Sequence, residues 1–496
     1  MKRRTNLALL AGVPVAVGLL LIACGDAPSA SPAPDVDAAI DSASPEDGAS
    51  PEGAVDAGRD APPPELRSRF VLLGDFGFDD SNELAVSQLV KAWEPEFIVT
   101  LGDNSYPESN AATIDETIGK YYAEFIFPYR GKYGPGATTP RFFACLGNHD
   151  WQSGSLKAHE DYFDLPNNER YWELVKGPVR FFCADSDTKE PDGTTEGSVQ
   201  GKWIQSRLEA ARDPFRIVVF HHPAHSSGQH GSQSYMQWPF QSWGASAVYT
   251  GHDHDYERFD FGPDTIPYVV QGLGGADLRP LATSRAGSVI AYSEKHGATF
   301  VEADSYYADL AAITIGLDRI DEHVIVSEKE AARASDVLLA AGSMLRFFDQ
   351  GAPPAGWATP AFDAAAWKTG AAPLGYGQGD EKTTLATGLA HYFRAAFTVS
   401  DPKAYDHAVV WVRRDDGAAV YVNGEEIART NLPAGVLTAQ TLAHEVVGFT
   451  AERAWIPAVV PSRLLRAGQN IVAVELHQAS AQSSDATLDL RIEAKR

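Results

Sequence analysis

The chain has 496 residues, which is too long for a single ordinary core and indicates two or three domains. Hydrophobic residues make up 44% of it, and Asp and Glu total 66 against 41 Lys and Arg. The formal net charge of -25 argues against a nucleic-acid-binding protein, because a negative protein repels the phosphate backbone. A phosphorylated small molecule would be captured locally, by metal ions rather than by overall charge.

The first 66 residues are predicted to form an export signal and a disordered tether. Three basic residues precede an apolar run that ends in Leu-Ile-Ala-Cys24, and this pattern resembles the lipobox of bacterial lipoproteins. Residues 1–23 would then be a signal peptide, and lipidated Cys24 would hold the exported protein at the cell envelope, on the periplasmic face or the outer surface. The alternative, a transmembrane anchor, calls for a longer unbroken run. Residues 24–66, rich in Ala, Pro, Ser and Asp, bury too little apolar surface to fold.

Residues 67–334 have a globular composition, and five apolar runs in this part each lead into polar side chains of metal-ligand types. The runs are RFVLLGDFG with Asp75, FIVTLGDNSY with Asp103 and Tyr106, RFFACLGNHD with Asn148, His149 and Asp150, RIVVFHHP with His221 and His222, and AVYTGHDH with His252 and His254. Such runs predict strands buried on both faces, and helical patterns in NELAVSQLVKAW and GSVQGKWIQSRLEAAR are expected to cover the sheets. Because sites in layered α/β folds form where strand ends meet, the five runs predict one shared centre.

The residue types at these strand ends favour a site for two metal ions. Carboxylate and phenolate are hard oxygen donors, and imidazole suits iron, zinc or manganese. Two metal ions about 3.5–4 Å apart need a ligand that bridges them, and a carboxylate can do so. The sequence offers two carboxylates, one Asn, one Tyr and three or more His at these positions.

The five segments, in this order, resemble the five motifs of the calcineurin-like metallophosphoesterases across nearly all of residues 70–260. A tyrosine in the second motif further resembles the purple acid phosphatases of the small, tartrate-resistant type. This resemblance implies an α/β fold in which a layered β-sandwich is flanked by helices. It implies Fe(III) on Asp75, Asp103, Tyr106 and His254, with Asp103 bridging to a divalent Fe, Zn or Mn ion on Asn148, His221 and His252. It also implies an acid phosphatase that hydrolyses phosphate monoesters by attack of a metal-bound hydroxide.

Further histidines are interpreted through the same resemblance. The family motif places the ligand two residues before a proline, which selects His221 over His222. A His-Gly pair nine residues beyond the ligand selects His230 as another active-site residue. His149 and His230 are expected to bind phosphate and protonate the leaving group. Asp150 is expected either to orient His149 or to cap a loop.

Residues 335–496 are predicted to form an all-β sandwich. Short alternating runs such as HYFRAAFTV, AVVWVRR and NIVAVELHQ are separated by turn signals, including Asn423-Gly424. The segment resembles jelly rolls of the galactose-binding-domain-like type, which implies either glycan binding or a passive stabilising role. Trp357, Trp367 and Tyr376 are candidates for stacking on sugar, although such rings in sandwiches more often belong to the core.

The state of Cys145 and Cys183 is left open by the sequence. Each lies in an apolar run, and buried free thiols on core strands are the preferred interpretation. A disulfide between them is the alternative in an exported protein.

Two further functions compete with a metal-dependent acid phosphatase. One is a phosphodiesterase or nucleotidase on the same scaffold, and the other is a glycan-binding surface protein with a vestigial site. A competent residue at every assigned ligand position argues against the second. The expected partners are a phosphate ester, the membrane through Cys24 alone, and glycan if the C-terminal domain binds it.

Overall fold

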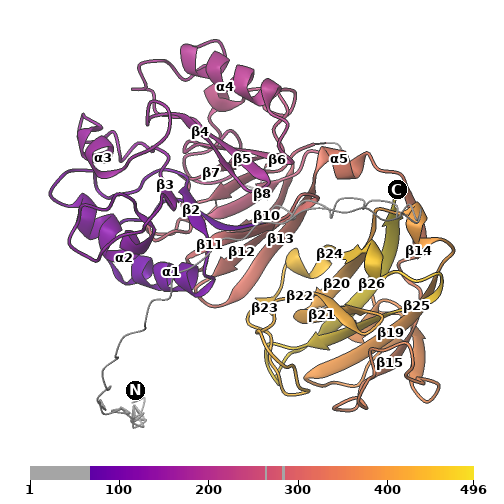
Figure 1. The fold of residues 1–496 in the computed structure, drawn as a ribbon. Helices are drawn as coiled ribbons and strands as arrows, with labels where there is room; N and C mark the ends of the chain where they lie inside the picture. The colour runs from indigo at the N-terminus through magenta and orange to yellow at the C-terminus, as the bar shows by residue number, and fades with distance from the viewer. Residues whose placement is uncertain (1–66, 263–264, 282–284) are drawn as a thin grey trace, which may run out of the picture. The chain divides into compact units, whose positions relative to one another are not determined.

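The computed structural model describes residues 67–262, 265–281 and 285–496 (Figure 1). The predicted signal peptide, the lipidation site at Cys24 and the predicted tether lie outside these residues. Within the described ranges, no helix combines the length and the apolar character needed to cross a membrane.

Two seven-stranded sheets carry the part of the chain in which the five motifs lie. The first sheet contains β1 (Ser68–Leu73), β2 (Phe97–Thr100), β3 (Phe142–Phe143), β11 (Gly297–Ala303), β12 (Tyr307–Thr314), β13 (Asp318–Val326) and β23 (Val446–Val447), in the order β23-β13-β12-β11-β1-β2-β3. The second sheet contains β4 (Trp172–Lys176), β5 (Val179–Cys183), β6 (Phe215–Val219), β7 (Ala247–Thr250), β8 (Tyr256–Phe259), β9 (Tyr268–Gln271) and β10 (Ser288–Tyr292), in the order β10-β8-β9-β7-β6-β5-β4.

The two sheets pack face to face, and their motif-bearing strands run parallel. Phe70 of β1 stacks on Phe97 of β2 and meets Phe181 of β5 edge-on, with ring centroids 5.1 Å apart in both pairs. Strands β1, β2 and β3 are parallel neighbours, as are β5, β6, β7 and β9. Every residue of β2, β6 and β7 is buried, which confirms the predicted strands with two covered faces. Their carboxyl ends are where the motif residues follow.

Helices cover the outer faces of both sheets (Figure 1). The helices over these sheets are α1 (Ser81–Ala92), α2 (Lys120–Tyr122), α3 (Lys157–Tyr162) and α4 (Val199–Ala210), with a π turn at Asp115–Gly119 and 3-10 turns at Ala123–Phe125 and Ser234–Met236. The short helix α5 (Glu328–Ala331) lies in the connection after β13, and further 3-10 turns at Pro402–Ala404, Ala451–Arg453 and Ser462–Leu464 lie among the later strands. Helix α1 begins where the Asp80 carboxylate accepts hydrogen bonds from two backbone N–H groups, and α4 is capped by Ser198 in the same way. Both helices predicted from the sequence are therefore confirmed, and their apolar faces pack on the first and second sheets respectively.

Cys145 and Cys183 form a disulfide, so the preferred interpretation of free thiols is wrong. Cys145 lies just after β3 of the first sheet, and Cys183 ends β5 of the second. The packing of the two sheets brings their Cα atoms to 6.1 Å, a separation that a disulfide spans. The sequence alone does not reveal that the two cysteines are close enough to bond, because they lie on different sheets.

Apart from β23, the strands from residue 335 onward form a second pair of sheets, which agrees with the predicted all-β fold. One sheet has the order β18-β17-β26-β20-β24 with β14 also on β26, and the other has the order β16-β15-β19-β25-β21-β22. Their strands are β14 (Ser335–Leu339), β15 (Met344–Phe348), β16 (Lys368–Ala371), β17 (Leu374–Tyr376), β18 (Thr383–Thr384), β19 (Ala390–Val399), β20 (His407–Asp415), β21 (Gly417–Val422), β22 (Glu425–Thr430), β24 (Ile456–Pro461), β25 (Gly468–His477) and β26 (Ala486–Lys495). The predicted Asn423-Gly424 turn joins β21 to β22, and both of its residues have positive φ.

The aromatic residues proposed to stack on sugar contact other parts of the sandwich. The Trp357 ring lies 5.1 Å from that of Tyr392 and 6.2 Å from that of Trp367, and Trp367 is only 8% exposed. Tyr376 packs against the core of the sandwich. These contacts match the core interpretation of the three rings.

A fully buried ion pair lies between the sandwich and the first sheet. Arg414 of β20 donates from Nη2 to Glu322 Oε2 of β13 at 2.6 Å, and both side chains are inaccessible to solvent. Glu322 also contacts Arg319, which pairs with Glu445 at 3.1 Å. The charge of each of these buried groups depends on its partners, because an isolated ion is costly in a protein interior.

Candidate metal centre

Sharp backbone turns at the strand ends direct the motif side chains toward one another. Asp75, Asp103 and His252 all have positive φ, between 51° and 76°, just beyond β1, β2 and β7. Gly102 and Gly147 permit the close approach of neighbouring segments. A Cβ on Gly102 would lie 2.6 Å from His221 Nδ1, and one on Gly147 would lie 2.2 Å from Asp103 Oδ1. Glycine is therefore required where these loops approach the centre.

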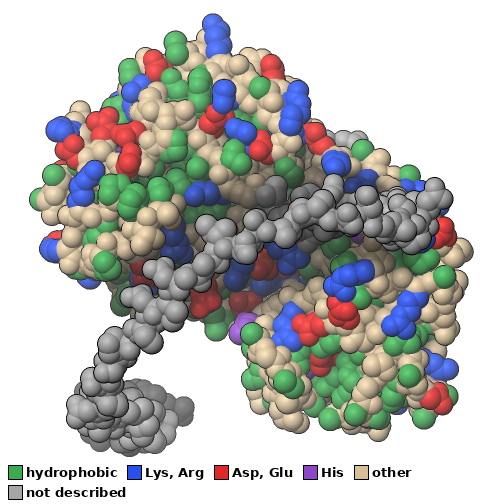
Figure 2. Space-filling model, viewed as in Figure 1, with side chains coloured by type: hydrophobic (Ala, Val, Ile, Leu, Met, Phe, Trp, Pro, Cys, Tyr) green, Lys and Arg blue, Asp and Glu red, His purple; other side chains and the backbone are tan. Residues whose placement is uncertain are grey.

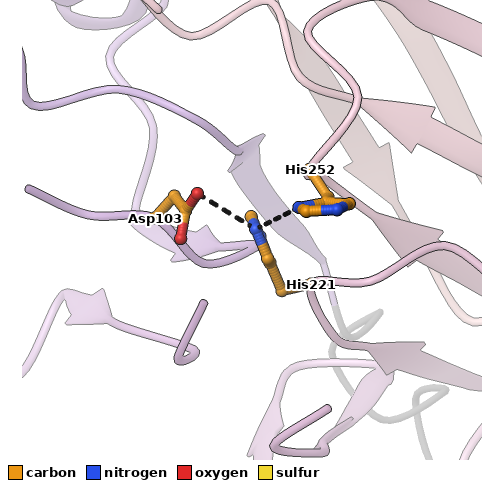
Figure 3. A group of neighbouring side chains, drawn as sticks. All are labelled: Asp103, His221 and His252. Carbon is orange, nitrogen blue, oxygen red and sulfur yellow. Dashed lines mark hydrogen bonds and ion pairs between the residues drawn. The ribbon is translucent and has the colours of Figure 1, made fainter. Parts of the chain in front are cut away.

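One half of the centre surrounds the Nε2 atom of His221 (Figure 3). This atom lies 3.1 Å from Asp103 Oδ2, 3.1 Å from Asn148 Oδ1 and 3.2 Å from His252 Nδ1. Asp103, His221 and His252 point toward one another from three different strand ends, and their ligand atoms fall within 4.8 Å. These three residues form a possible Asp/His metal site.

The other half of the centre surrounds the phenol of Tyr106. Its hydroxyl lies 3.3 Å from Asp75 Oδ1, 3.2 Å from Asp103 Oδ2 and 3.4 Å from His254 Nε2. Asp103 Oδ2 therefore belongs to both halves, which is the position that a bridging carboxylate occupies. The structure brings all seven predicted ligands together, and their binding of metal remains a prediction.

Burial and neighbouring charges shift the pKa values of the ionisable side chains in this group. Burial, together with the neighbouring Asp103, raises the pKa of Asp75 to about 8. Burial opposes the charged form of His221, but the adjacent Asp103 raises its pKa to about 10. Burial and the proximity of His221 lower the pKa of His252. The ionised Asp103 carboxylate is thus paired with a charged His221, whereas the buried carboxyl of Asp75 favours its neutral form.

The donor set fits metal cations better than it fits protons. His221 Nε2 carries at most one proton, yet it faces two acceptor oxygens and a ring nitrogen of His252 within 3.2 Å. Cations placed among these oxygen and nitrogen atoms would satisfy all of them and favour the ionised carboxylates. Asp75, Asp103, Tyr106 and His254 would hold one ion, and Asp103, Asn148, His221 and His252 would hold the other.

His149 lies at the edge of this centre. Its Nδ1 is 2.6 Å from Pro107 O, its Nε2 is 3.9 Å from Asp103 Oδ2, and its ring is 4.4 Å from that of Tyr106. The side chain is half-buried, so one side of the ring remains open to solvent. This position suits contact with a ligand held at the centre.

Asp150 points away from the His149 ring and stabilises the surrounding loops. Its carboxylate is completely buried and accepts hydrogen bonds from Ser109 Oγ at 2.7 Å and from Gly147 N and Asn104 Nδ2, both at 2.9 Å. In the described ranges no hydrogen bond joins it to the His149 ring. The described residues therefore show no contact through which Asp150 would orient His149. The hydrogen bonds that Asp150 accepts from the surrounding loops match the alternative of a loop cap.

His230 is positioned by Asp253, a residue whose role the sequence analysis missed. The Asp253 carboxylate accepts hydrogen bonds from the backbone N–H groups of His230 at 2.8 Å and Gly231 at 3.2 Å, and it also accepts one from Ser226. The exposed His230 ring lies 4.3 Å from that of His252. The sequence feature that could have indicated this role is the position of Asp253 between two predicted ligands in Gly-His-Asp-His. A buried carboxylate at that position can accept hydrogen bonds from the backbone of a neighbouring loop.

The remaining histidines near the motifs have other surroundings. His222 Nδ1 pairs with Ser186 Oγ at 2.9 Å, and burial, with His221 beside it, lowers the His222 pKa to about 3. Its ring lies 4.4 Å from that of His252, so it supports the centre from behind. His225 packs among the rings of Phe259, Phe261 and Tyr268.

Residues 68–256 match the family described as calcineurin-like phosphoesterase. This part of the chain is a calcineurin-like metallophosphoesterase domain, and a β-rich region follows it. The match spans all five motifs and confirms the resemblance predicted from them. Members of this family use a binuclear metal centre, and Asp103, His221 and His252 form a possible Asp/His metal site in this chain.

Several solved structures match parts of the chain. GAP50, the anchor in the inner membrane complex of Plasmodium, is 20% identical with a TM-score of 0.43, covering 53% of this chain and 90% of its own. Purple acid phosphatase PPD1 from yellow lupin seeds is 18% identical with a TM-score of 0.43, covering 54% of this chain and 55% of its own. A Bacteroides uniformis β-glucuronidase is 14% identical with a TM-score of 0.23, covering 32% of this chain and 18% of its own. No curated protein matches the chain.

Proposed function

We propose that this protein hydrolyses phosphate monoesters at a binuclear metal centre, in the manner of a purple acid phosphatase. The observation that carries the proposal is the convergence of seven donor side chains around Asp103 Oδ2 and His221 Nε2. Tyr106 supports the purple type, because its hydroxyl lies within 3.4 Å of Asp75, Asp103 and His254. Fe(III) on the phenolate side and a divalent Fe, Zn or Mn ion on the imidazole side fit these donors.

The roles of the chain's own residues follow from their places. Bound metal ions supply positive charge for the phosphoryl oxygens and a water molecule whose pKa is lowered. His149, with one side of its ring open and its Nδ1 held by Pro107 O, can bind a phosphoryl oxygen and protonate a leaving group. His230 would assist from the other side of the centre, held by Asp253.

Elemental analysis and a substrate screen test this function together. The purified full-length protein should contain two metal ions per chain, and iron bound to the Tyr106 phenolate should give a purple colour that Tyr106→Phe removes. It should release phosphate from 4-nitrophenyl phosphate faster than it cleaves bis(4-nitrophenyl) phosphate. A preference for the diester would favour the phosphodiesterase alternative. Fewer than two metals in fully loaded protein, with no hydrolysis, would leave a glycan-binding protein with a vestigial site.

We also propose that the protein is exported and anchored through lipidated Cys24. The support is the basic start, the apolar run and the lipobox-like Leu-Ile-Ala-Cys24. Mass spectrometry of the membrane fraction should find a diacylglycerol-modified Cys24, and Cys24→Ala should release the protein from that fraction. An unmodified Cys24 in mature protein would contradict the anchor.

A further inference from the structure

A guanidinium group lies at the rim of the centre, in contact with His230. Arg279 donates from Nη1 to His230 Nε2, and its backbone N–H donates to His254 O at 3.2 Å. Because a guanidinium group has donors only, the His230 nitrogen accepts this hydrogen bond. The His230 ring in turn lies 4.3 Å from that of His252, a predicted ligand. The fixed positive charge on this wall of the centre therefore belongs to Arg279.

A second guanidinium group lies beside the same loop. A Cβ on Gly231 would come within 3.2 Å of Arg285 Nη2, and the Arg285 backbone N–H donates to Ser227 Oγ at 2.9 Å. Within the described chain, neither Arg279 nor Arg285 has a carboxylate oxygen within 4.0 Å. Arg279 thus contacts His230 and Arg285 lies beside Gly231, so both guanidinium groups border the same loop at the edge of the site without a direct ion pair to a described residue.

This local charge contrasts with the rest of the protein. The formal net charge is -25, and on the face in view acidic and basic side chains are interspersed (Figure 2). A ligand with several negative charges gains little from the overall field and depends on nearby cations. The planar guanidinium fork binds phosphate and carboxylate through paired hydrogen bonds, which makes arginine suited to that task.

We propose that Arg279, assisted by Arg285, forms an anion subsite beside the metal centre, and that the substrate is a phosphate ester bearing a second phosphate. The inference rests on the proposed function, with the scissile phosphate at the metal centre and the second phosphate at the guanidinium group. A single imidazole ring, that of His230, separates Arg279 from His252. A linker of about three carbons spans such a distance, since each bond advances the chain by little more than 1 Å.

Two substrates that differ by one group test the subsite. Phosphate release is measured from propyl phosphate and from 1,3-propanediol bisphosphate, with wild type, Arg279→Gln, Arg285→Gln and the control Arg466→Gln. Arg466 is exposed on the sandwich and undergoes the same loss of charge. Wild type should prefer the bisphosphate by about tenfold or more in kcat/KM. Arg279→Gln should lower the ratio of kcat/KM for the bisphosphate to kcat/KM for propyl phosphate by about 10- to 100-fold, with a smaller drop in this ratio for Arg285→Gln.

Binding without turnover gives an independent readout. Calorimetric titration of the metal-loaded protein with 1,3-propanediphosphonate and propylphosphonate should show the same preference, and Arg279→Gln should abolish it. Equal loss for both substrates in Arg279→Gln, or no preference in wild type, would overturn the subsite and leave the proposed hydrolysis intact. If neither ester is hydrolysed, the proposed function fails, and the phosphonate titration alone decides whether Arg279 binds a second anionic group.

Discussion

Replacing His159 by leucine should make the protein more resistant to acid. His159 lies in α3, is 1% exposed and packs against the tilted ring of Phe163 with ring centroids 4.9 Å apart. Within the described chain neither of its ring nitrogens has a hydrogen-bond partner. Burial alone lowers the pKa of His159 to about 3, from an ordinary value of 6.5. The folded protein therefore holds this imidazole neutral at a pH where the unfolded chain protonates it.

The size of the effect follows from proton linkage. Above pH 6.5 both states are neutral and the group adds no pH dependence. As the pH falls from 6.5 toward 3, only the unfolded chain gains the proton, so the free energy of unfolding decreases by about 1.4 kcal/mol per pH unit. At pH 4 the loss is about 3 kcal/mol, and it levels off near 5 kcal/mol below pH 3. His159→Leu removes this loss and keeps an apolar side chain against Phe163.

Urea unfolding of metal-free protein, followed by tryptophan fluorescence between pH 7.5 and 4, measures the difference. Metal-free protein is used so that release of metal in acid does not contribute. The variant's advantage over wild type should grow by about 3 kcal/mol across this range. His444→Leu, which changes an exposed histidine, should follow wild type. Parallel curves for wild type and His159→Leu, or an NMR titration of the His159 ring near pH 6.5 in folded protein, would refute the reasoning.

Three further outcomes are expected. Asp103→Ala should remove metal and activity together, whereas His149→Ala should retain both metals by elemental analysis and lose about 10²- to 10⁴-fold in kcat, the usual contribution of a general acid; wild-type turnover in Asp103→Ala would contradict the site. Asp253→Asn should keep metal but lower kcat at least tenfold, because the amide replaces one acceptor oxygen by an NH₂ group that cannot accept from the backbone N–H groups of His230 and Gly231. An unchanged rate would show that Asp253 does not position His230. Glu322→Gln should destabilise the protein by about 3–5 kcal/mol in thermal unfolding, because Arg414 stays charged and buried; Lys157→Ala, which breaks an exposed pair with Asp161, should change stability by less than about 1 kcal/mol, and equal effects would contradict the distinction.

The sequence predicted the strands and the convergence of the site because both depend on local patterns. Apolar runs such as Phe215–Val219 specify buried parallel strands, and the residue after each run then lies at a known edge of the sheet. Glycine before Asp75, Asp103 and His252 marked the turns. Each apolar run, its glycine and the polar residue that follows lie within a few positions of one another, so a single sequence is enough to identify them.

What the sequence missed depends on contacts between distant segments. The Cys145–Cys183 bridge requires the distance between two sheets. Asp150 and Asp253 each accept hydrogen bonds from backbone N–H groups, which every residue except proline carries, so residue types alone do not reveal these contacts. Arg279 lies 25 positions beyond His254 in a segment without a motif, and its contact with His230 appears only in the folded chain.

The disulfide has a consequence for how the centre responds to stress. Asp75, Asp103 and Asn148 follow strands of the first sheet, whereas His221 and His252 follow strands of the second, so the proposed binding of two metal ions would require the two sheets to keep their relative position. The disulfide between Cys145 and Cys183 joins one sheet to the other, three residues before Asn148, and limits how far the two sheets can separate. Heating that loosens side-chain packing leaves this link in place, and because both cysteines are fully buried, a thiol reductant would reach the bond only once the fold has opened.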